Sequence, residues 1–278
     1  MQTIQAWLKT SSQLTTTDNH PIKINDLRLL VEHLLQQNRT WIYAHLEHLL
    51  SSSQIEQLTQ WLKALQAGQP LAYITGEQMF WDLKLKVNSH TLIPRPDTEI
   101  LIETVIELLA NNPPKRILDL GTGSGALALV LAKINPNADV LAVDSSDAAL
   151  AVANNNARIN KISNIKFQQS DWFDGISPCQ FDLIVCNPPY IAADDTHLED
   201  LQHEPIAALV ADQNGLGDYL RIIAKAKDFL IQGGLLIFEH GWQQQQQVQA
   251  TLSHAGFKNI DFRKDLAGHD RITFAYKR

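Results

Sequence analysis

The sequence predicts an α/β protein: a mostly parallel, seven-stranded, doubly wound sheet that follows a small N-terminal helical bundle and a β-hairpin linker. Apolar residues near the N-terminus recur every three or four positions, which is the helical period. From residue 115 onward strand and helix patterns alternate, and a glycine-rich turn joins the first strand to its helix. We therefore expect a helical domain at residues 1–75, a hairpin and linker at 76–98, and an α/β domain at 99–278.

The N-terminal quarter is expected to fold into three or four short helices. Apolar side chains at residues 27–35 repeat with helical spacing, Thr40 suggests another helix start, and residues 53–56 have the pattern of a capping box. His45 and His48 also stand at helical spacing, but no carboxylate or cysteine accompanies them. We interpret them as packing or surface histidines and expect no metal site in this protein.

The composition is typical of a globular protein, with 45% hydrophobic and 19% charged residues. The 23 Lys and Arg against 30 Asp and Glu give a net charge of −7, and residues 1–76 contain five of each sign. The acidic excess therefore lies in residues 77–278, where it penalises a polyanionic substrate such as nucleic acid. The two cysteines, Cys179 and Cys186, form neither a disulfide framework nor a zinc pattern. Without a secretory signal pattern or an apolar run of about 18 residues, we expect a cytoplasmic protein with no membrane partner.

The hairpin and linker come next along the chain. Residues 83–87 alternate between apolar side chains and lysine, which predicts one arm of a hairpin. In residues 92–99 two prolines favour an extended backbone, and Asp97 with Thr98 can start the helix expected at 100–109. This stretch is either a rigid charged linker or a loop presented to a site, because a fixed backbone holds its side chains in place.

Helices and strands then alternate. Strands are expected at residues 117–120, 140–143, 165–167, 181–186, 235–238, 260–263 and 272–276. Helices are expected at residues 126–133, 147–160 and 218–231, and around the glutamine run 243–247. The strand 181–186 is apolar apart from Asp182, which is typical of a strand buried on both faces. We interpret the glutamine run as a solvated face and expect Gly233 and Gly234 to separate helix from strand.

A glycine-rich loop follows the first of these strands. It consists of Gly121, Thr122, Gly123, Ser124 and Gly125. Its glycines permit a tight turn and let a ligand approach the backbone amides at the start of the next helix. Asp144 ends the second strand, 23 residues after Gly121, where an acid suits the two hydroxyls of an adenosine ribose. The order of strand, loop, helix, strand and acid predicts a nucleoside-binding site.

The loop alone does not distinguish a dinucleotide from S-adenosylmethionine, because Gly121, Gly123 and Ala126 also satisfy the dinucleotide fingerprint. Asp119 lies two residues before the first glycine, at the end of its strand. A carboxylate there would repel a pyrophosphate, whereas it suits a ligand that carries a sulfonium and an ammonium group. The charge therefore favours S-adenosylmethionine over a nicotinamide dinucleotide.

Asn187, Pro188, Pro189 and Tyr190 follow the apolar strand 181–186, at the sheet edge where ligands of open α/β sheets bind. This tetrapeptide suits the methylation of a planar nitrogen, whose delocalised lone pair is a poor nucleophile. The side-chain oxygen of Asn187 and the carbonyl of Pro188 can each accept one N–H and direct the lone pair at the methyl group. The prolines stiffen the backbone, and the ring of Tyr190 can stack on the flat acceptor. We expect Asn187, Pro188 and Tyr190 to be catalytic and all four residues to bind the acceptor.

Five stretches carry a resemblance to a known family. Asp-Leu-Gly-Thr-Gly-Ser-Gly at residues 119–125 and Asn-Pro-Pro-Tyr at 187–190 by themselves indicate an amino-methyltransferase. More specific are Leu-Ile-Pro-Arg-Pro-Asp-Thr-Glu at 92–99, Gln-Ser-Asp-Trp-Phe at 169–173 and Phe-Glu-His-Gly-Trp at 238–242. Over nearly all of its length the chain resembles the peptide-chain release factor N5-glutamine methyltransferases of the PrmC or HemK type.

The resemblance implies a Rossmann-like class I methyltransferase fold and S-adenosylmethionine as the methyl donor. It implies that residues 121–125 and Asp144 hold the donor, that Trp172 packs beside its adenine, and that Asn187 touches donor and acceptor. The acceptor would be the glutamine of the Gly-Gly-Gln loop of class 1 release factors, which act in translation termination. We expect residues 1–75 to recognise the folded release factor and the protein to act as a monomer.

Two alternatives stay open on the sequence. A DNA adenine N6-methyltransferase shares the tetrapeptide, because the amino group of adenine poses the same chemical problem. It should carry a basic target-recognition region, whereas this chain has a neutral helical domain and an acidic core. A non-catalytic S-adenosylmethionine-binding adaptor would have a decayed site, and the complete donor and acceptor motifs speak against it.

Overall fold

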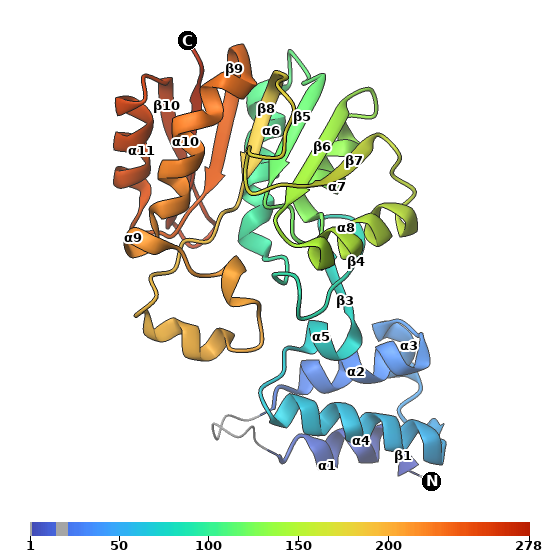
Figure 1. Cartoon of the computed structure of the whole chain (residues 1–278). Coiled ribbons are helices and arrows are strands. Elements are labelled where there is room, and N and C mark those ends of the chain that lie inside the picture. Colours follow the sequence, from blue (N-terminus) through green and yellow to red (C-terminus); the bar gives the residue numbers. More distant parts are fainter. Residues whose placement is uncertain (1, 15–21) are drawn as a thin grey trace. The chain divides into compact units, whose positions relative to one another are not determined.

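The computed structural model describes residues 2–14 and 22–278 of the chain. The chain divides into two compact units, Met1–Glu77 and Gln78–Arg278, each with its own buried core (Figure 1). Among the described residues, no helix combines the length and the apolarity that a membrane crossing needs.

The first unit is a helical bundle. In its described part the helices are α1 (Ile4–Ser11), α2 (Ile24–Leu35), α3 (Arg39–Ala44), α4 (Ser52–Gln66) and α5 (Leu71–Thr75), and the short strands β1 (Gln2–Thr3) and β2 (Leu49–Leu50) pair antiparallel. The fully buried Leu27, Leu30 and Leu58 belong to its core. The expectation of three or four helices is too low. Pro70 directly precedes α5, because proline is tolerated at a helix start.

The start of α4 differs from the expected capping box at residues 53–56. The box is formed by Ser51 and Gln54: the Gln54 N–H donates to the Ser51 hydroxyl at 3.2 Å, and the Ser51 N–H donates to Oε1 of Gln54 at 2.8 Å. The same sequence rule is satisfied two residues earlier, because glutamine serves as well as glutamate at the third helical position.

The start of α3 is also displaced. Asn38, and not Thr40, caps the helix, because its side-chain oxygen accepts the N–H of Trp41 at 2.9 Å. The ring of His45 stacks on Trp41 with centroids 4.2 Å apart, and His48 meets the same indole edge-on at 5.4 Å. Both histidines are therefore packed against an aromatic side chain.

The second unit is built on a seven-stranded sheet. Its strands are β5 (Arg116–Leu120), β6 (Asp139–Asp144), β7 (Ile165–Gln169), β8 (Phe181–Cys186), β9 (Leu230–Glu239), β10 (Lys258–Lys264) and β11 (Asp270–Tyr276). Their order is β10-β11-β9-β8-β5-β6-β7, with β11 antiparallel to both of its neighbours and the other neighbouring pairs parallel. A separate hairpin consists of β3 (Glu77–Phe80) and β4 (Leu83–Lys86). The predicted mostly parallel sheet and the predicted hairpin are thus confirmed.

Helices lie on both faces of the sheet (Figure 1). The helical segments of this unit are η1 (Pro96–Thr98), α6 (Glu99–Leu109), α7 (Ala126–Ile134), α8 (Asp147–Ile159), η2 (Thr196–Leu201), η3 (Ile206–Ala208), α9 (Asp212–Gly215), α10 (Gly217–Phe229) and α11 (Gln245–His254). Because successive strand residues point to opposite faces, Ile117 packs with α6 and α7, whereas Leu118 packs with α10 and α11. Burial on both faces explains the apolar run at residues 183–186 of β8.

The boundary between α10 and β9 differs from the expectation. α10 ends at Phe229 and β9 begins at Leu230, so Gly233 and Gly234 lie inside the strand instead of before it. The pairing of β9 with β8 shifts its register in this region, and Gly233 has a φ of +76°, which glycine adopts without strain. The two glycines therefore accommodate an irregularity of the strand.

Candidate active site

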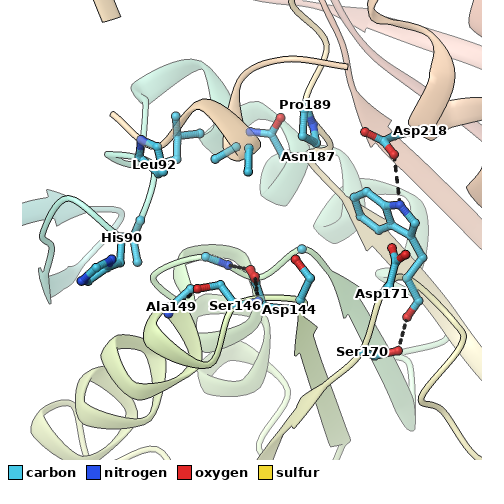
Figure 2. Close-up of a pocket in the computed structure, with 18 of the residues that line it drawn as sticks. His90, Leu92, Asp144, Ser146, Ala149, Ser170, Asp171, Asn187, Pro189 and Asp218 are labelled. Carbon is cyan, nitrogen blue, oxygen red and sulfur yellow. Dashed lines mark hydrogen bonds between the residues drawn. The ribbon is translucent and has the colours of Figure 1, made fainter. Parts of the chain in front are cut away.

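Two loops meet at the carboxyl edge of the sheet. β5 and β8 pair in parallel with Leu120 opposite Cys186, so the glycine loop after β5 and the tetrapeptide after β8 start side by side. A cavity of about 350 Å³ opens at this edge together with a smaller one of about 50 Å³, and Gly121, Gly123 and Asn187 line both. The two predicted motifs are thus brought together in one site (Figure 2).

The glycine loop has a backbone that other residues adopt only with strain. Gly121, Gly123 and Gly125 have φ angles of +72°, +57° and +86°. The N–H groups of Gly121 and Thr122 both donate to the carbonyl of Val143 at 2.9 Å, which anchors the loop to β6. The loop is therefore shaped by its glycines and held by the main chain of the next strand.

Asp144 lines the larger cavity at the end of β6 (Figure 2). Its carboxylate accepts the N–H of Gly123 through Oδ2 at 2.8 Å and that of Ser146 through Oδ1 at 2.9 Å. The side chain therefore joins the loops that follow β5 and β6. Binding of a ribose stays a prediction, and ordering of the glycine loop is a second role that the sequence spacing did not indicate.

Trp172 lines the larger cavity from the loop after β7. Its indole N–H donates to Oδ1 of Asp218 on α10 at 3.1 Å, and its carbonyl accepts from the hydroxyl of Ser170 at 2.7 Å (Figure 2). The ring lies so close to the glycine loop that a Cβ at Gly121 would meet it at 3.3 Å. Burial raises the pKa of Asp218, although the bond from Trp172 acts in the opposite direction. The flat ring forms a wall where an adenine is predicted.

Asp119 lines the smaller cavity and is 1% exposed. Burial raises the pKa of its carboxyl to about 7. Within the described residues its Oδ2 has no hydrogen-bond partner. A buried polar atom without a partner is costly, and a cationic group of a ligand would supply one. The residues around the cavities therefore fit S-adenosylmethionine, which carries an ammonium and a sulfonium group.

Two side chains from distant parts of the chain, Thr98 and Glu239, lie beside Asn187 of the tetrapeptide. The amide nitrogen of Asn187 donates to Oγ1 of Thr98 at 3.5 Å. Glu239, at the end of β9, is 2% exposed. Burial raises the pKa of Glu239 to about 7, although the Thr98 side chain, the charge of Arg271 and the Asn187 side chain act in the opposite direction.

These contacts orient the carboxamide of Asn187. The hydroxyl oxygen of Thr98 accepts from the amino end of the carboxamide, and the buried carboxyl of Glu239 lies near both side chains. The described chain supplies no hydrogen bond to Oδ1 of Asn187. This oxygen is the one predicted to accept an N–H of the substrate, and the structure leaves it available.

Thr98 has a different role from the expected one. Neither Asp97 nor Thr98 caps α6, because η1 runs directly into that helix and a capping residue needs a non-helical backbone. Thr98 is instead buried and bonded to Asn187. Sequence reasoning assigned neither Thr98 nor Glu239 to the site. Their only signal was that they stand in two of the stretches that carry the family resemblance.

The tetrapeptide is divided between the cavity and the interior. Asn187 and Pro189 line the larger cavity (Figure 2). Pro188 is buried and Tyr190 is half-buried, and neither is among the residues that line the two cavities. Burial raises the pKa of Tyr190 to about 12, which keeps its hydroxyl protonated. The roles of Pro188 and Tyr190 toward the acceptor stay predictions.

The linker before α6 also reaches the site, through Arg95 and Thr98 in the wall of the smaller cavity. Arg95 forms an ion pair with Oε1 of Glu204, and Oε2 of the same carboxylate accepts the N–H of Ile93 at 3.0 Å. The Glu204 side chain is almost fully buried, so the pair ties the linker to the loop before η3. Residues of the stretch 92–99 therefore line a cavity of the candidate site, as the interpretation of a loop presented to a site expects.

Two family models match the chain. One described as "Methyltransferase small domain" matches residues 96–265, and one described as "PrmC N-terminal domain" matches residues 5–76. A solved ribosomal protein L11 methylase from Lactobacillus delbrueckii subsp. bulgaricus has a TM-score of 0.50 at 26% identity, over 66% of this chain and 81% of that chain. A methyltransferase from Pyrococcus furiosus has a TM-score of 0.54 at 17% identity, over 82% and 99%, and speaks for the fold alone. Fold and site define an S-adenosylmethionine-dependent methyltransferase of the predicted Rossmann-like class I.

Curated relatives extend over almost the whole chain. It is 44% identical over 273 residues to the release factor glutamine methyltransferase of Salmonella typhimurium, and these residues cover 97% of both chains. The corresponding protein of Escherichia coli is 41% identical over 271 residues, again 97% of both, and that of Aliivibrio fischeri is 41% identical over 273 residues, 97% of this chain and 96% of the relative. The chain belongs to the release factor glutamine methyltransferase family, and the resemblance seen in its sequence is confirmed.

Proposed function

We propose that this protein transfers a methyl group from S-adenosylmethionine to the side-chain amide nitrogen of the glutamine in the Gly-Gly-Gln loop of class 1 peptide-chain release factors. The observation that carries the proposal is the orientation of the Asn187 carboxamide, whose amino group donates to Thr98 so that Oδ1 is left to accept an N–H. Membership of the release factor glutamine methyltransferase family supports the substrate.

On the donor side, different residues are assigned to different parts of S-adenosylmethionine. Bound S-adenosylmethionine supplies a methyl group on a positively charged sulfur. We assign residues 121–125 and Asp144 to holding its ribose end, and Trp172 to packing against its adenine. Asp119 offers the unpartnered Oδ2 to the ammonium group. Asn187 lines both cavities and therefore adjoins the donor, and we assign it to contact with donor and acceptor.

The acceptor side has to aim a poor nucleophile. Oδ1 of Asn187 and the carbonyl of Pro188 each accept one N–H of the substrate amide, and the ring of Tyr190 stacks on its plane. No base is needed before the attack, because the proton can leave after the methyl group arrives. Catalysis is by positioning with electrostatic help, and one preorganised partner of this kind contributes on the order of 10²-fold in rate.

The two alternatives have less support. The acidic excess of residues 77–278 disfavours a DNA substrate, and the unpartnered Oδ2 of Asp119 in the wall of the smaller cavity disfavours a decayed site. Because the proposed partner is a translation factor, we expect the protein to work in the cytoplasm, without direct contact to nucleic acid or membrane. We expect it to act as a monomer.

The test compares three acceptors with purified protein and methyl-labelled S-adenosylmethionine. These are a class 1 release factor, the same factor with the glutamine of Gly-Gly-Gln replaced by alanine, and duplex DNA. We expect label in the first alone. Label in the DNA would establish the first alternative, label in the alanine-substituted factor would place the acceptor elsewhere, and donor binding without any transfer would favour the adaptor.

We further propose that residues 1–75 recognise the folded release factor and take no part in the chemical step. Every proposed site residue lies after residue 90, and a Gly-Gly-Gln loop offers little of the roughly 800 Å² that a specific protein partner buries. Deleting residues 1–75 should leave donor affinity unchanged and raise KM for the intact factor. Light scattering must first exclude aggregation of the truncated protein, and an unchanged KM would remove the recognition role.

A further inference from the structure

One member of the glutamine run at residues 243–247 behaves differently from its neighbours. Gln243, Gln246 and Gln247 are exposed, whereas Gln244 is half-buried and both ends of its carboxamide are hydrogen bonded. The interpretation of the run as a solvated face is therefore wrong for Gln244. Because β9 lies beside β8 in the sheet, the loop that follows β9 and contains this residue lies beside the tetrapeptide that follows β8.

The carboxamide of Gln244 connects three loops. Its Nε2 donates to the main-chain carbonyl of Tyr190 at 2.9 Å and to that of Gly215 at 3.4 Å. Its Oε1 accepts the N–H of Gly241 at 3.0 Å. These partners belong to the tetrapeptide, to the end of α9 and to the loop after β9. One side chain therefore satisfies main-chain groups of all three.

The tetrapeptide depends on such partners because of its composition. Pro188 and Pro189 have no N–H, so the main chain cannot continue the hydrogen bonding of β8 through them. Tyr190 is the first residue that can donate again, and its N–H bonds the carbonyl of Leu209 at 3.2 Å. The carbonyl of Tyr190 receives its hydrogen bond from Gln244. Both main-chain groups of Tyr190 are thus held by segments far away in the sequence.

Gly215 shows how closely the main chain packs at this point. A Cβ there would lie 2.1 Å from the carbonyl oxygen of Tyr190 and 2.7 Å from Nε2 of Gln244. Gly215 also has a φ of +81°, where any other residue would be strained. The carbonyl of Tyr190 is therefore confined between Gly215 and Gln244.

We propose that Gln244 is a positioning residue of the acceptor site. It holds the main chain of Tyr190 and thereby fixes the aromatic ring and the preceding carbonyl of Pro188 in the arrangement that receives the substrate amide. This inference rests on the proposed function, because it assigns those two groups to the acceptor. Removing the bond to Tyr190 should therefore reduce turnover without reducing donor binding.

Three substitutions in the full-length chain test this role. Gln244→Met keeps the length of the side chain and removes both hydrogen-bonding ends. Gln244→Glu keeps an oxygen for the N–H of Gly241 but removes the donor to Tyr190. Gln246→Met, exposed in the same run, is the matched control. For each, calorimetry gives Kd for S-adenosylmethionine, kinetics give kcat on a release factor, and hydrogen exchange is followed at the N–H groups of Tyr190 and Ile191.

We expect both Gln244 variants to lower kcat by about tenfold and to speed exchange at Tyr190 by a similar factor, with donor Kd within about twofold of wild type. Gln246→Met should change none of these. Wild-type kcat in Gln244→Glu, or equal losses of donor binding and turnover, would overturn the proposal. Where the buried charge of Gln244→Glu prevents folding, Gln244→Met decides by the same criteria.

The exchange measurement separates this proposal from the proposed function. If the wild-type protein methylates no release factor, the proposed function fails. Faster exchange at Tyr190 in the Gln244 variants, but not in Gln246→Met, still supports the positioning role. Unchanged exchange at Tyr190 overturns the positioning role whatever the substrate is.

Discussion

The two sides of the site are built in different ways. On the donor side the glycine loop is held by the strand beside it, and the N–H of Gly123 bonds Asp144, which is 21 residues away in the sequence. On the acceptor side Asn187 and Tyr190 are held by side chains that are 89 and 54 residues away. The glycine loop of the donor side is thus a local construction, although Trp172 on that side is held by Asp218, 46 residues away. The acceptor side depends throughout on distant parts of the domain.

This difference predicts how substitutions divide between binding and turnover. The donor side consists largely of main-chain groups, so changes of its few side chains should alter affinity for S-adenosylmethionine. The acceptor side consists of oriented dipoles that stabilise the transition state of methyl transfer. Changes there should therefore alter kcat. Each of the following variants tests one side of this division.

Asn187→Ala should have the largest effect. Loss of one positioned acceptor should lower kcat by on the order of 10²-fold or more while the fold stays intact. Steady-state kinetics on a release factor measure this, with circular dichroism as the check of folding. Asn155→Ala, at an exposed position on α8, is the control. Near-normal turnover of a folded Asn187→Ala protein would contradict the tetrapeptide mechanism.

Asp144→Ala should act on the donor side alone. The lost charge-assisted hydrogen bonds should weaken S-adenosylmethionine binding by roughly ten- to a hundredfold, with little change in KM for the release factor. Calorimetry measures the affinity, and Asp139→Ala, at the exposed start of the same strand, is the control. Unchanged affinity would remove Asp144 from the site. Binding of NADH in place of S-adenosylmethionine would remove the methyl donor altogether.

Glu239→Gln should change how the free energy of unfolding depends on pH, because it removes the buried carboxyl beside Asn187. Burial raises the pKa of Glu239 from 4.5 to about 7, so between these values the folded protein holds a proton that the unfolded chain has released. The free energy of unfolding therefore falls as pH rises through this window, and it stays lowered above it.

In the Glu239→Gln variant the free energy of unfolding does not fall in this way as pH rises, because glutamine has no carboxyl group to titrate. Its stability relative to wild type should be higher at about pH 8 than at about pH 5, by on the order of 2 kcal/mol. Urea unfolding at the two pH values measures the difference, and Glu103→Gln on the exposed side of α6 is the control. A pH-independent difference would show that Glu239 is not a buried carboxyl of raised pKa.

Thr98→Val should have the smallest effect. It keeps the shape of the side chain and removes the hydroxyl that accepts from the Asn187 amide, so kcat should fall by roughly three- to tenfold with donor affinity unchanged. Thr104→Val, a buried threonine whose hydroxyl bonds only its own helix, is the control. Equal kcat values for the two variants would mean that Thr98 does not orient Asn187.

Local sequence patterns were sufficient to predict most of the fold and the glycine loop with Asp144 on the donor side. The predicted bounds of β8 agree with the structure at both ends, because the strand, apolar apart from Asp182, stands between the polar Gln180 and Asn187. The glycine loop and Asp144 meet as expected, because spacing within one strand–helix–strand unit varies little. The start of α4 was displaced because the same capping rule is satisfied at Ser51 as well as at Ser53.

The acceptor side could not be predicted in this way. A threonine that caps a helix and one that faces Asn187 look alike in sequence, and Thr98 turned out to be the second kind. Nothing local separates Gln244 from its four neighbouring glutamines, because its partner Tyr190 is set by the pairing of β8 with β9. Contacts of long sequence separation depend on the register of the sheet, which a single sequence does not reveal.

The central claim is that the protein methylates the side-chain amide nitrogen of one glutamine. Tandem mass spectrometry of a release factor, digested after incubation with the protein and S-adenosylmethionine, tests it most directly. We expect the peptide that contains Gly-Gly-Gln to gain the mass of one methyl group, with fragment ions that place the group on the glutamine side chain. The Asn187→Ala protein should leave the same peptide unmodified. A methyl group on any other residue, or an unmodified Gly-Gly-Gln peptide after the donor has been consumed, would contradict the claim.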